Sequence, residues 1–206
     1  MTNRPHPMLR SIATLICCLA LAACGGGGDA WHGTDVSGST PDLSFRMTRA
    51  SDEKPVTAAD YRGKIVLLYF GYTYCPDVCP LTLSHLGQMM KSIDGAKDNI
   101  RVLFVTVDPQ RDTLDTLKQY TSSFGPEFVG LRGTDNQLAS LAKRYRVAYS
   151  ADPDNDPAKY VVTHSSAVYV FDRQGNARLL FTDLSTADAD LKGPTADLRR
   201  LLSQPR

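Results

Sequence analysis

The chain has 206 residues, of which 42% are hydrophobic and 22% charged, a length and composition that suit one globular domain or at most two small ones. Its 23 basic and 22 acidic side chains give a formal net charge of +1, and no run of lysines or arginines occurs. Without a basic field to hold a phosphate backbone, nucleic-acid binding is disfavoured. The five cysteines are an odd number, so pairing them in disulfides would leave one thiol over. Each cysteine is therefore assigned to its part of the chain before any pairing is considered.

Residues 1–23 have the pattern of a bacterial signal peptide. Arg4 and Arg10 precede an uncharged, largely apolar run at 12–23. As a helix this run spans about 18 Å, well short of the ~30 Å hydrocarbon core of a bilayer, so a permanent transmembrane helix is not expected. The run ends in LAAC, which resembles the bacterial lipobox and implies a lipoprotein whose Cys24 carries the lipid. The alternative is an ordinary secretory signal with an incidental cysteine.

Residues 24–40 are expected to form a flexible tether between the lipid and the domain. Four glycines follow Cys24, and the stretch up to Thr40 is rich in serine, threonine, glycine and aspartate. Trp31 and His32 lie within this stretch, where an interface contact or no role at all is a better interpretation than a ligand role.

From residue 41 onward, strand-length apolar runs alternate with amphipathic segments, which predicts one α/β domain over 41–206. The order matches a thioredoxin-like fold, with a mixed sheet that is largely parallel at its centre and flanked by helices. In such sheets ligands bind beyond the carboxyl ends of the strands, which points to the loop at 72–80. The expected elements are an N-terminal hairpin (42–47 and 54–57), a buried strand (64–71), a helix (81–93), a second buried strand (100–107), a helix (113–124), a short strand (128–131), a helix (134–145), a terminal strand pair (167–171 and 178–181) and a closing helix (195–202).

Two cysteines lie in that loop, in the segment GYTYCPDVCP. If Cys79 stands in the first turn of the following helix, Cys75 lies near the same face, and the positive end of the helix dipole favours thiolates there. Thiolates bind soft metals such as Cu(I) or attack disulfides, and the CxxxC spacing suits two donors on one ion. A buried disulfide or two inert core cysteines are the alternatives. The other three cysteines are accounted for by the signal peptide and the lipid anchor: Cys17, Cys18 and Cys24.

A third donor would make such a site more selective and would admit Cu(II), for which imidazole is well suited. His85 follows Cys79 by six residues, which turns it away from the sulfurs and predicts a solvated surface residue. His164 precedes a predicted strand, in a loop that the fold would bring near the cysteines. A lone histidine in that position is more often structural. The two nearby cysteines make a metal-ligand role for His164 a stronger hypothesis.

Several segments in order resemble the Sco/SenC family, over about residues 41–202. These are membrane-tethered, thioredoxin-fold copper proteins associated with cytochrome c oxidase assembly. The resemblance implies that Cys75, Cys79 and His164 bind copper. It departs from the family pattern at Thr163, where the family usually has aspartate, so orientation of the imidazole by that acid cannot be assumed. The segments are GYTYCPDVCP (71–80), TVDPQRDT (106–113), FGPEFVGLRGT (124–134) and THSSAVYVFD (163–172).

Two acidic residues near the cysteines have two interpretations each. Asp108 lies at the end of the second central strand. The family pattern implies that it supports the metal loop or helps a partner to dock, and the alternative is a turn acid before a proline. Asp77 either aids partner recognition or caps the helix. Three further acids at 152–156 do not fit a calcium loop, because Pro157 stands at the required glycine position and Thr163 at the required glutamate position, so a mobile loop is expected instead.

Two functions compete. The first is a copper metallochaperone, lipid-anchored in the bacterial cell envelope and facing the periplasm, that receives Cu(I) or Cu(II) from an upstream donor. The resemblance implies that it delivers copper to the binuclear site of cytochrome c oxidase subunit II. The second is a thiol-disulfide oxidoreductase that uses Cys75 and Cys79 as a redox-active disulfide, either to reduce the acceptor's cysteines or to act in redox signalling. The absence of a proline between Ala158 and Asp172, where thioredoxin-like reductases place one opposite the cysteines, favours the metal role.

Overall fold

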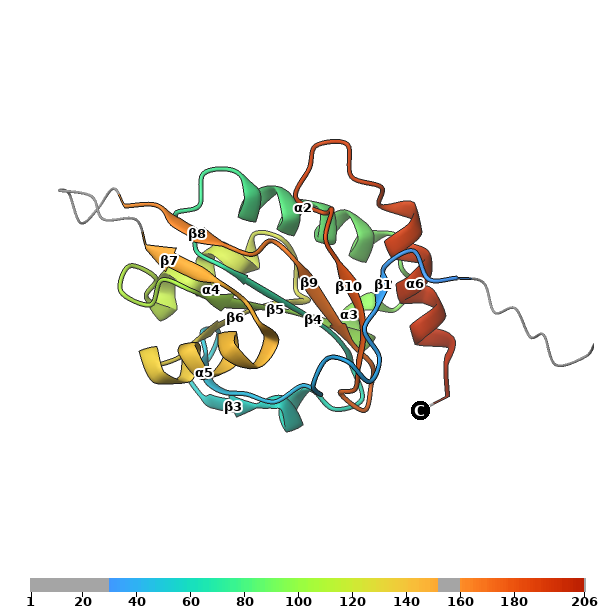
Figure 1. Cartoon of the computed structure of the whole chain (residues 1–206), viewed down its shortest axis with the longest axis horizontal. Helices are drawn as coiled ribbons and strands as arrows, with labels where there is room; N and C mark the ends of the chain where they lie inside the picture. Colours follow the sequence, from blue (N-terminus) through green and yellow to red (C-terminus); the bar gives the residue numbers. More distant parts are fainter. Residues whose placement is uncertain (1–29, 152–159, 206) are drawn as a thin grey trace, which may run out of the picture. The chain divides into compact units, whose positions relative to one another are not determined.

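The computed structural model describes residues 30–151 and 160–205, in which eight strands form one sheet in the order β1-β10-β9-β4-β5-β6-β2-β3 (Figure 1). The β4–β5 and β5–β6 pairs are parallel, and each remaining pair in this sheet is antiparallel. The sheet is therefore mixed, with its parallel pairs at the centre, as the sequence predicts. The strands are β1 (Thr34–Asp35), β2 (Arg46–Arg49), β3 (Pro55–Thr57), β4 (Ile65–Gly71), β5 (Ile100–Thr106), β6 (Phe128–Arg132), β9 (Val168–Phe171) and β10 (Ala177–Phe181). β7 (Tyr149–Ala151) and β8 (Val162–His164) form a separate antiparallel pair.

Helices cover both faces of the sheet (Figure 1). α2 and α6 lie on one face, where Arg199 of α6 donates to the carbonyl of Ser92 at the end of α2. α5 lies on the opposite face, where the Tyr145 ring packs against Phe171 of β9. The helices are η2 (Ala58–Tyr61), α2 (Val78–Lys91), α3 (Ala96–Asn99), α4 (Leu114–Ser122), α5 (Asp135–Tyr145) and α6 (Lys192–Ser203).

The central strands explain why the chain folds in this order. Every residue of β4 is buried, as a β-branched and aromatic run between two helical layers should be. β4, α2 and β5, followed by the antiparallel pair β9 and β10 and the closing helix α6, are the thioredoxin-like arrangement that the sequence predicts.

Two helices begin earlier than predicted. α2 starts at Val78 and α6 at Lys192, three residues before the expected starts in each case. Pro80 and Pro194 are the third residues of their helices, where proline is tolerated because the N–H it lacks has no partner in a first turn. No described helix is both long enough and apolar enough to cross a membrane.

The expected tether is wrong for residues 31–36, which pack against the domain. β1 pairs with β10, and Trp31 lies against the core and under the guanidinium of Arg200, 3.9 Å from the ring centroid. The buried carboxylate of Asp197 on α6 accepts the backbone N–H groups of His32 and Gly33. The polar composition of the segment suggested flexibility. Its contacts could not be foreseen because they come from residues more than 140 positions away.

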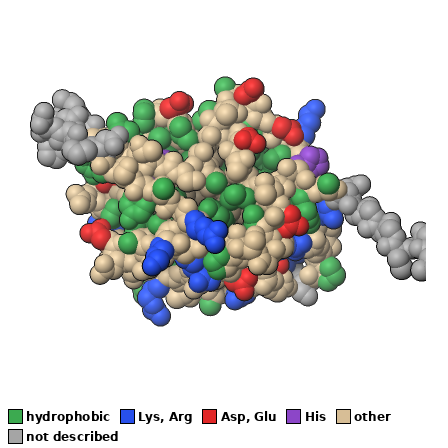
Figure 2. Space-filling model, in the orientation of Figure 1, with side chains coloured by type: hydrophobic (Ala, Val, Ile, Leu, Met, Phe, Trp, Pro, Cys, Tyr) green, Lys and Arg blue, Asp and Glu red, His purple; other side chains and the backbone are tan. Residues whose placement is uncertain are grey.

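Charge of both signs is distributed over the face shown in Figure 2, as a near-neutral chain leads one to expect. Residues 24–29 of the expected tether, which include Cys24, and the signal peptide lie outside the described residues.

Candidate metal centre

The loop between β4 and α2 places both thiols at the N-terminus of α2. Cys79 is the second residue of the helix and is fully buried, whereas Cys75 is half-buried. The backbone N–H of Cys79 donates to Sγ of Cys75 over 3.4 Å, and the two cysteines are free thiols. Cys79 therefore stands in the first turn, the position in which the sequence analysis expected both sulfurs to share one face.

His164 completes a three-residue group. It lies at the end of β8, paired with Tyr149 of β7, rather than in the loop that the sequence predicted. Its Nε2 is 3.1 Å from Sγ of Cys79, and the ligand atoms of Cys75, Cys79 and His164 all lie within 4.8 Å of one another. Two sulfurs and one imidazole nitrogen at this separation can hold a metal ion.

The imidazole of His164 is oriented by a backbone carbonyl. Nδ1 lies 3.0 Å from the carbonyl oxygen of Ser165, and since a carbonyl can only accept, Nδ1 carries the proton. Nε2 then presents its lone pair toward the thiols, which is the tautomer a metal ligand needs. Thr163, which stands where the family usually has aspartate, has an exposed side chain. The carbonyl of Ser165 therefore orients the imidazole in this chain.

The two thiols differ electrostatically. The pKa of Cys75 is held well below its usual value, chiefly by a hydrogen bond from the Cys79 thiol, with further hydrogen bonds from the backbone N–H groups of Asp77 and Cys79. The pKa of Cys79 is raised by the neighbouring sulfur of Cys75 and by burial. Cys75 is therefore the thiolate of the pair, and Cys79 keeps its proton until something replaces it.

Aromatic side chains and one glycine enclose the group. The rings of Tyr72 and Tyr69 meet the imidazole of His164 edge-on, with centroids 5.8 Å and 6.2 Å away. Gly71 ends β4 where a Cβ would stand 2.8 Å from Sγ of Cys79, so no larger residue fits without displacing the sulfur or its neighbours. The buried side of the site is therefore closely packed.

Asp108 lies beside this group but does not belong to it. Its buried carboxylate forms an ion pair with Arg111 and accepts the hydroxyl of Tyr160. The guanidinium of Arg111 lies over the Tyr160 ring at 3.6 Å and 5.7 Å from the Tyr72 ring, which in turn meets His164. Asp108 thus reaches the site through other side chains, and its carboxylate is not exposed to a partner.

Asp77 occupies the N-cap position of α2, yet its side chain makes no capping hydrogen bond. The capping interpretation is therefore wrong. Its carboxylate is exposed between the two cysteines, which leaves partner recognition as a prediction.

Two positions differ from the sequence analysis in other ways. Asp112, which the sequence analysis did not single out, is fully buried and accepts the N–H and hydroxyl of Thr73 and the hydroxyl of Thr106. Asp112 ties the start of the cysteine loop to the end of β5, and its position within TVDPQRDT was the one sequence signal that could have identified it.

His85 faces away from the thiols as predicted, but it is buried and not solvated. Its Nδ1 lies 3.0 Å from the Leu184 carbonyl oxygen, because α6 and the segment before it cover this side of α2.

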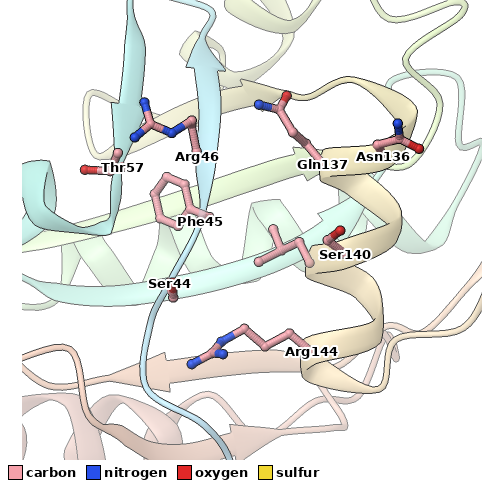
Figure 3. A pocket seen from close by; sticks show the side chains of 9 residues that line it. Ser44, Phe45, Arg46, Thr57, Asn136, Gln137, Ser140 and Arg144 are labelled. Carbon is pink, nitrogen blue, oxygen red and sulfur yellow. The ribbon is translucent and has the colours of Figure 1, made fainter.

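The acidic stretch at 152–156 lies outside the described residues. An open hollow of about 680 Å³ between the segment before β2 and α5 contains no thiol or histidine (Figure 3). It is separate from the metal-binding group, and its lining includes Ser44, Phe45, Arg46, Gln137 and Arg144.

The fold and this group define a thioredoxin-like protein with a site of two thiols and one imidazole. The SCO1/SenC family model matches residues 37–199, and the chain belongs to that family. It is 40% identical over 144 residues to the mitochondrial SCO2 homolog of Bos taurus, covering 69% of this chain and 53% of that protein. The chain thus spans about half the length of that relative.

Solved structures agree with this assignment. The structure of Bradyrhizobium japonicum ScoI with copper bound is 33% identical, with a TM-score of 0.69, and the match covers 79% of this chain and 99% of that one. Arabidopsis thaliana ScoI with copper bound is 30% identical with a TM-score of 0.70, and the match covers 80% and 99%.

Proposed function

We propose that this protein is a copper metallochaperone that binds copper through Cys75, Cys79 and His164. The observation that carries the proposal is the convergence of two sulfurs and an imidazole nitrogen within 4.8 Å, with the imidazole already in its ligand tautomer. Thiolates select Cu(I), and the added imidazole also accommodates Cu(II). The copper-bound ScoI structures of the same fold support this choice of metal.

The arrangement also suits release of the metal by ligand exchange. Cys75 is half-buried and is the sulfur that an incoming ligand can reach, whereas Cys79 is buried behind it. An acceptor thiol would displace Cys75 first and the two deeper donors afterwards. From the family resemblance, we propose that the acceptor is the binuclear copper site of cytochrome c oxidase subunit II and that an upstream donor supplies the copper.

We further propose that the domain is held at a membrane by lipid on Cys24 and faces the periplasm. Under this proposal residues 1–23 are removed and the folded domain begins near Trp31, where the chain packs against α6 and β10. Mass spectrometry of the membrane-extracted protein would detect a lipidated N-terminal peptide that begins at Cys24. An unmodified N-terminus at another position would contradict the anchor.

The copper proposal is tested by competitive titration of the reduced protein with Cu(I) and by the spectrum of the Cu(II) complex. We expect Cys75→Ser and Cys79→Ser to lose most of the Cu(I) affinity and His164→Ala to lose the Cu(II) spectrum. His85→Asn is the matched control, since it is on α2 but away from the group and the amide can still donate to Leu184. Unchanged copper binding in His164→Ala would refute the three-ligand site.

The asymmetry of the two thiols favours one second function, a thiol-disulfide oxidoreductase. The Cys75 thiolate would attack a partner's disulfide, releasing one partner thiolate and forming a mixed disulfide; Cys79, after losing its proton, would then form the Cys75–Cys79 disulfide and release the second partner thiolate. The two functions separate in an oxidase-assembly assay with His164→Ala. Full rescue by a variant that does not hold copper would favour the redox function.

A further inference from the structure

The hydroxyl of Tyr69 is a buried polar group without a hydrogen-bond partner. Tyr69 lies on β4 and is fully buried. Buried hydroxyls in folded proteins almost always have a partner, so an unpaired one next to a functional group calls for a physical reason. A strand position that needed only an aromatic ring would be filled equally well by phenylalanine.

The surroundings of Tyr69 point to the metal centre. Tyr69 and Gly71 are two residues apart on β4 and thus face the same side of the sheet, and Gly71 directly abuts Sγ of Cys79. Cys79 and Thr82 of α2 both lie close enough to the Tyr69 hydroxyl to alter its pKa, although neither contact has the geometry of a hydrogen bond. The Tyr69 ring also meets the imidazole of His164.

A protonated thiol is a weak acceptor, whereas a thiolate is a strong one. Metal binding converts Cys79 from thiol to thiolate, with the proton released to solvent. We propose that Tyr69 is a positioning residue of the metal centre, whose hydroxyl donates a hydrogen bond to the sulfur of Cys79 when that sulfur binds the metal. This inference rests on the proposed copper site and adds a donor that fixes and tunes one of its ligands.

The proposal predicts opposite behaviour in the two states of the protein. Without metal, the hydroxyl of Tyr69 is desolvated and unpaired, so replacing it by hydrogen removes nothing favourable. With metal, the same replacement removes a hydrogen bond to a charged sulfur. A donor to a thiolate also lowers the energy of the sulfur electrons, so its loss moves the sulfur-to-Cu(II) charge-transfer band to longer wavelength.

The test compares Tyr69→Phe with Tyr120→Phe. Tyr120 is a matched control because its hydroxyl is also buried and unpartnered, and its ring packs on Phe104 over the same face of the sheet. We expect Tyr69→Phe to keep or raise the melting temperature of the metal-free protein, to gain less thermal stability than wild type on copper loading, and to shift the charge-transfer band to longer wavelength. Tyr120→Phe should match wild type in the last two measurements.

The outcomes distinguish this inference from the proposed function. A wild-type protein that shows neither a charge-transfer band nor copper-induced stabilisation would refute the copper site and this role of Tyr69 with it. A wild-type protein that shows both, with Tyr69→Phe indistinguishable from it, would refute the role of Tyr69 alone. Equal shifts in Tyr69→Phe and Tyr120→Phe would also refute it, because a general change in polarity would then explain them.

Discussion

Gly71 connects the packing of the sheet to the geometry of the metal centre, and Gly71→Ala tests that connection. The added methyl would stand 2.8 Å from Sγ of Cys79 and 2.7 Å from Cε2 of Phe104, whereas ordinary contact begins at 3.4 Å. The backbone of Gly71 has no positive φ, so alanine is compatible with it and the strain is purely steric. Either the Cys79 sulfur or the Phe104 ring must move.

The expected magnitude combines two opposing effects. Alanine at a compatible position stabilises by about 0.4–1 kcal/mol through the unfolded chain. Overpacking a dense core costs about 1–3 kcal/mol. We therefore expect Gly71→Ala to lower the free energy of unfolding by about 1–2 kcal/mol in urea denaturation. Because the Cys79 sulfur is a ligand in the proposed copper site, the affinity for Cu(I) should also fall at least about tenfold, or 1.4 kcal/mol.

Gly130→Ala on β6 is the matched control. Its methyl would stand 3.1 Å from Cβ of Leu117 and 3.3 Å from Cβ of Ala50, a milder crowding in the same sheet but away from the thiols. It should lose stability without any change in copper affinity. Wild-type stability together with wild-type copper affinity in Gly71→Ala would show that this close approach does not position the sulfur.

Three further predictions concern other parts of the fold. Asp197→Ala should lower the free energy of unfolding by about 2–4 kcal/mol, because it leaves the backbone N–H groups of His32 and Gly33 unpaired. It should also red-shift the fluorescence of Trp31, the single tryptophan. An unchanged emission maximum would mean that other contacts hold the N-terminal segment. Since the pKa of Cys75 is lowered, its alkylation by iodoacetamide should stay fast at about pH 6, below the ordinary thiol pKa of about 8.5, and a rate that falls as for a free thiol would contradict this. Burial raises the pKa of Asp112 above its ordinary value of 3.8, so the folded state holds the proton more tightly and stability declines as the pH rises just above that value. Asp112→Asn should lack this decline, and identical slopes for the two proteins would refute it.

The cysteine site was predictable from sequence because its signals are local. A strand-length apolar run, a CxxxC segment and a helix follow one another directly, and this order places both sulfurs at the carboxyl end of β4. His164 lies 85 positions beyond Cys79. The resemblance to the Sco/SenC family and the expected fold together predicted His164 as the third ligand. In the structure its Nε2 lies 3.1 Å from Sγ of Cys79.

The features that sequence reasoning missed depend on distant partners. Residues 31–35 read as a tether because their polar composition does not reveal that β10 and Asp197 hold them. His85 read as solvated because helical spacing gives its direction but not what covers that direction. Asp112 was inside a quoted motif, yet only the folded structure shows that its carboxylate joins two loops.

X-ray absorption spectroscopy of the copper-loaded protein tests the central claim most directly, because it counts the atoms bound to the metal. We predict two sulfur ligands and one nitrogen ligand in the wild-type protein, and loss of the nitrogen with both sulfurs retained in His164→Ala. A copper ion bound by fewer than two sulfurs, or a nitrogen ligand that persists in His164→Ala, would contradict the assignment of Cys75, Cys79 and His164.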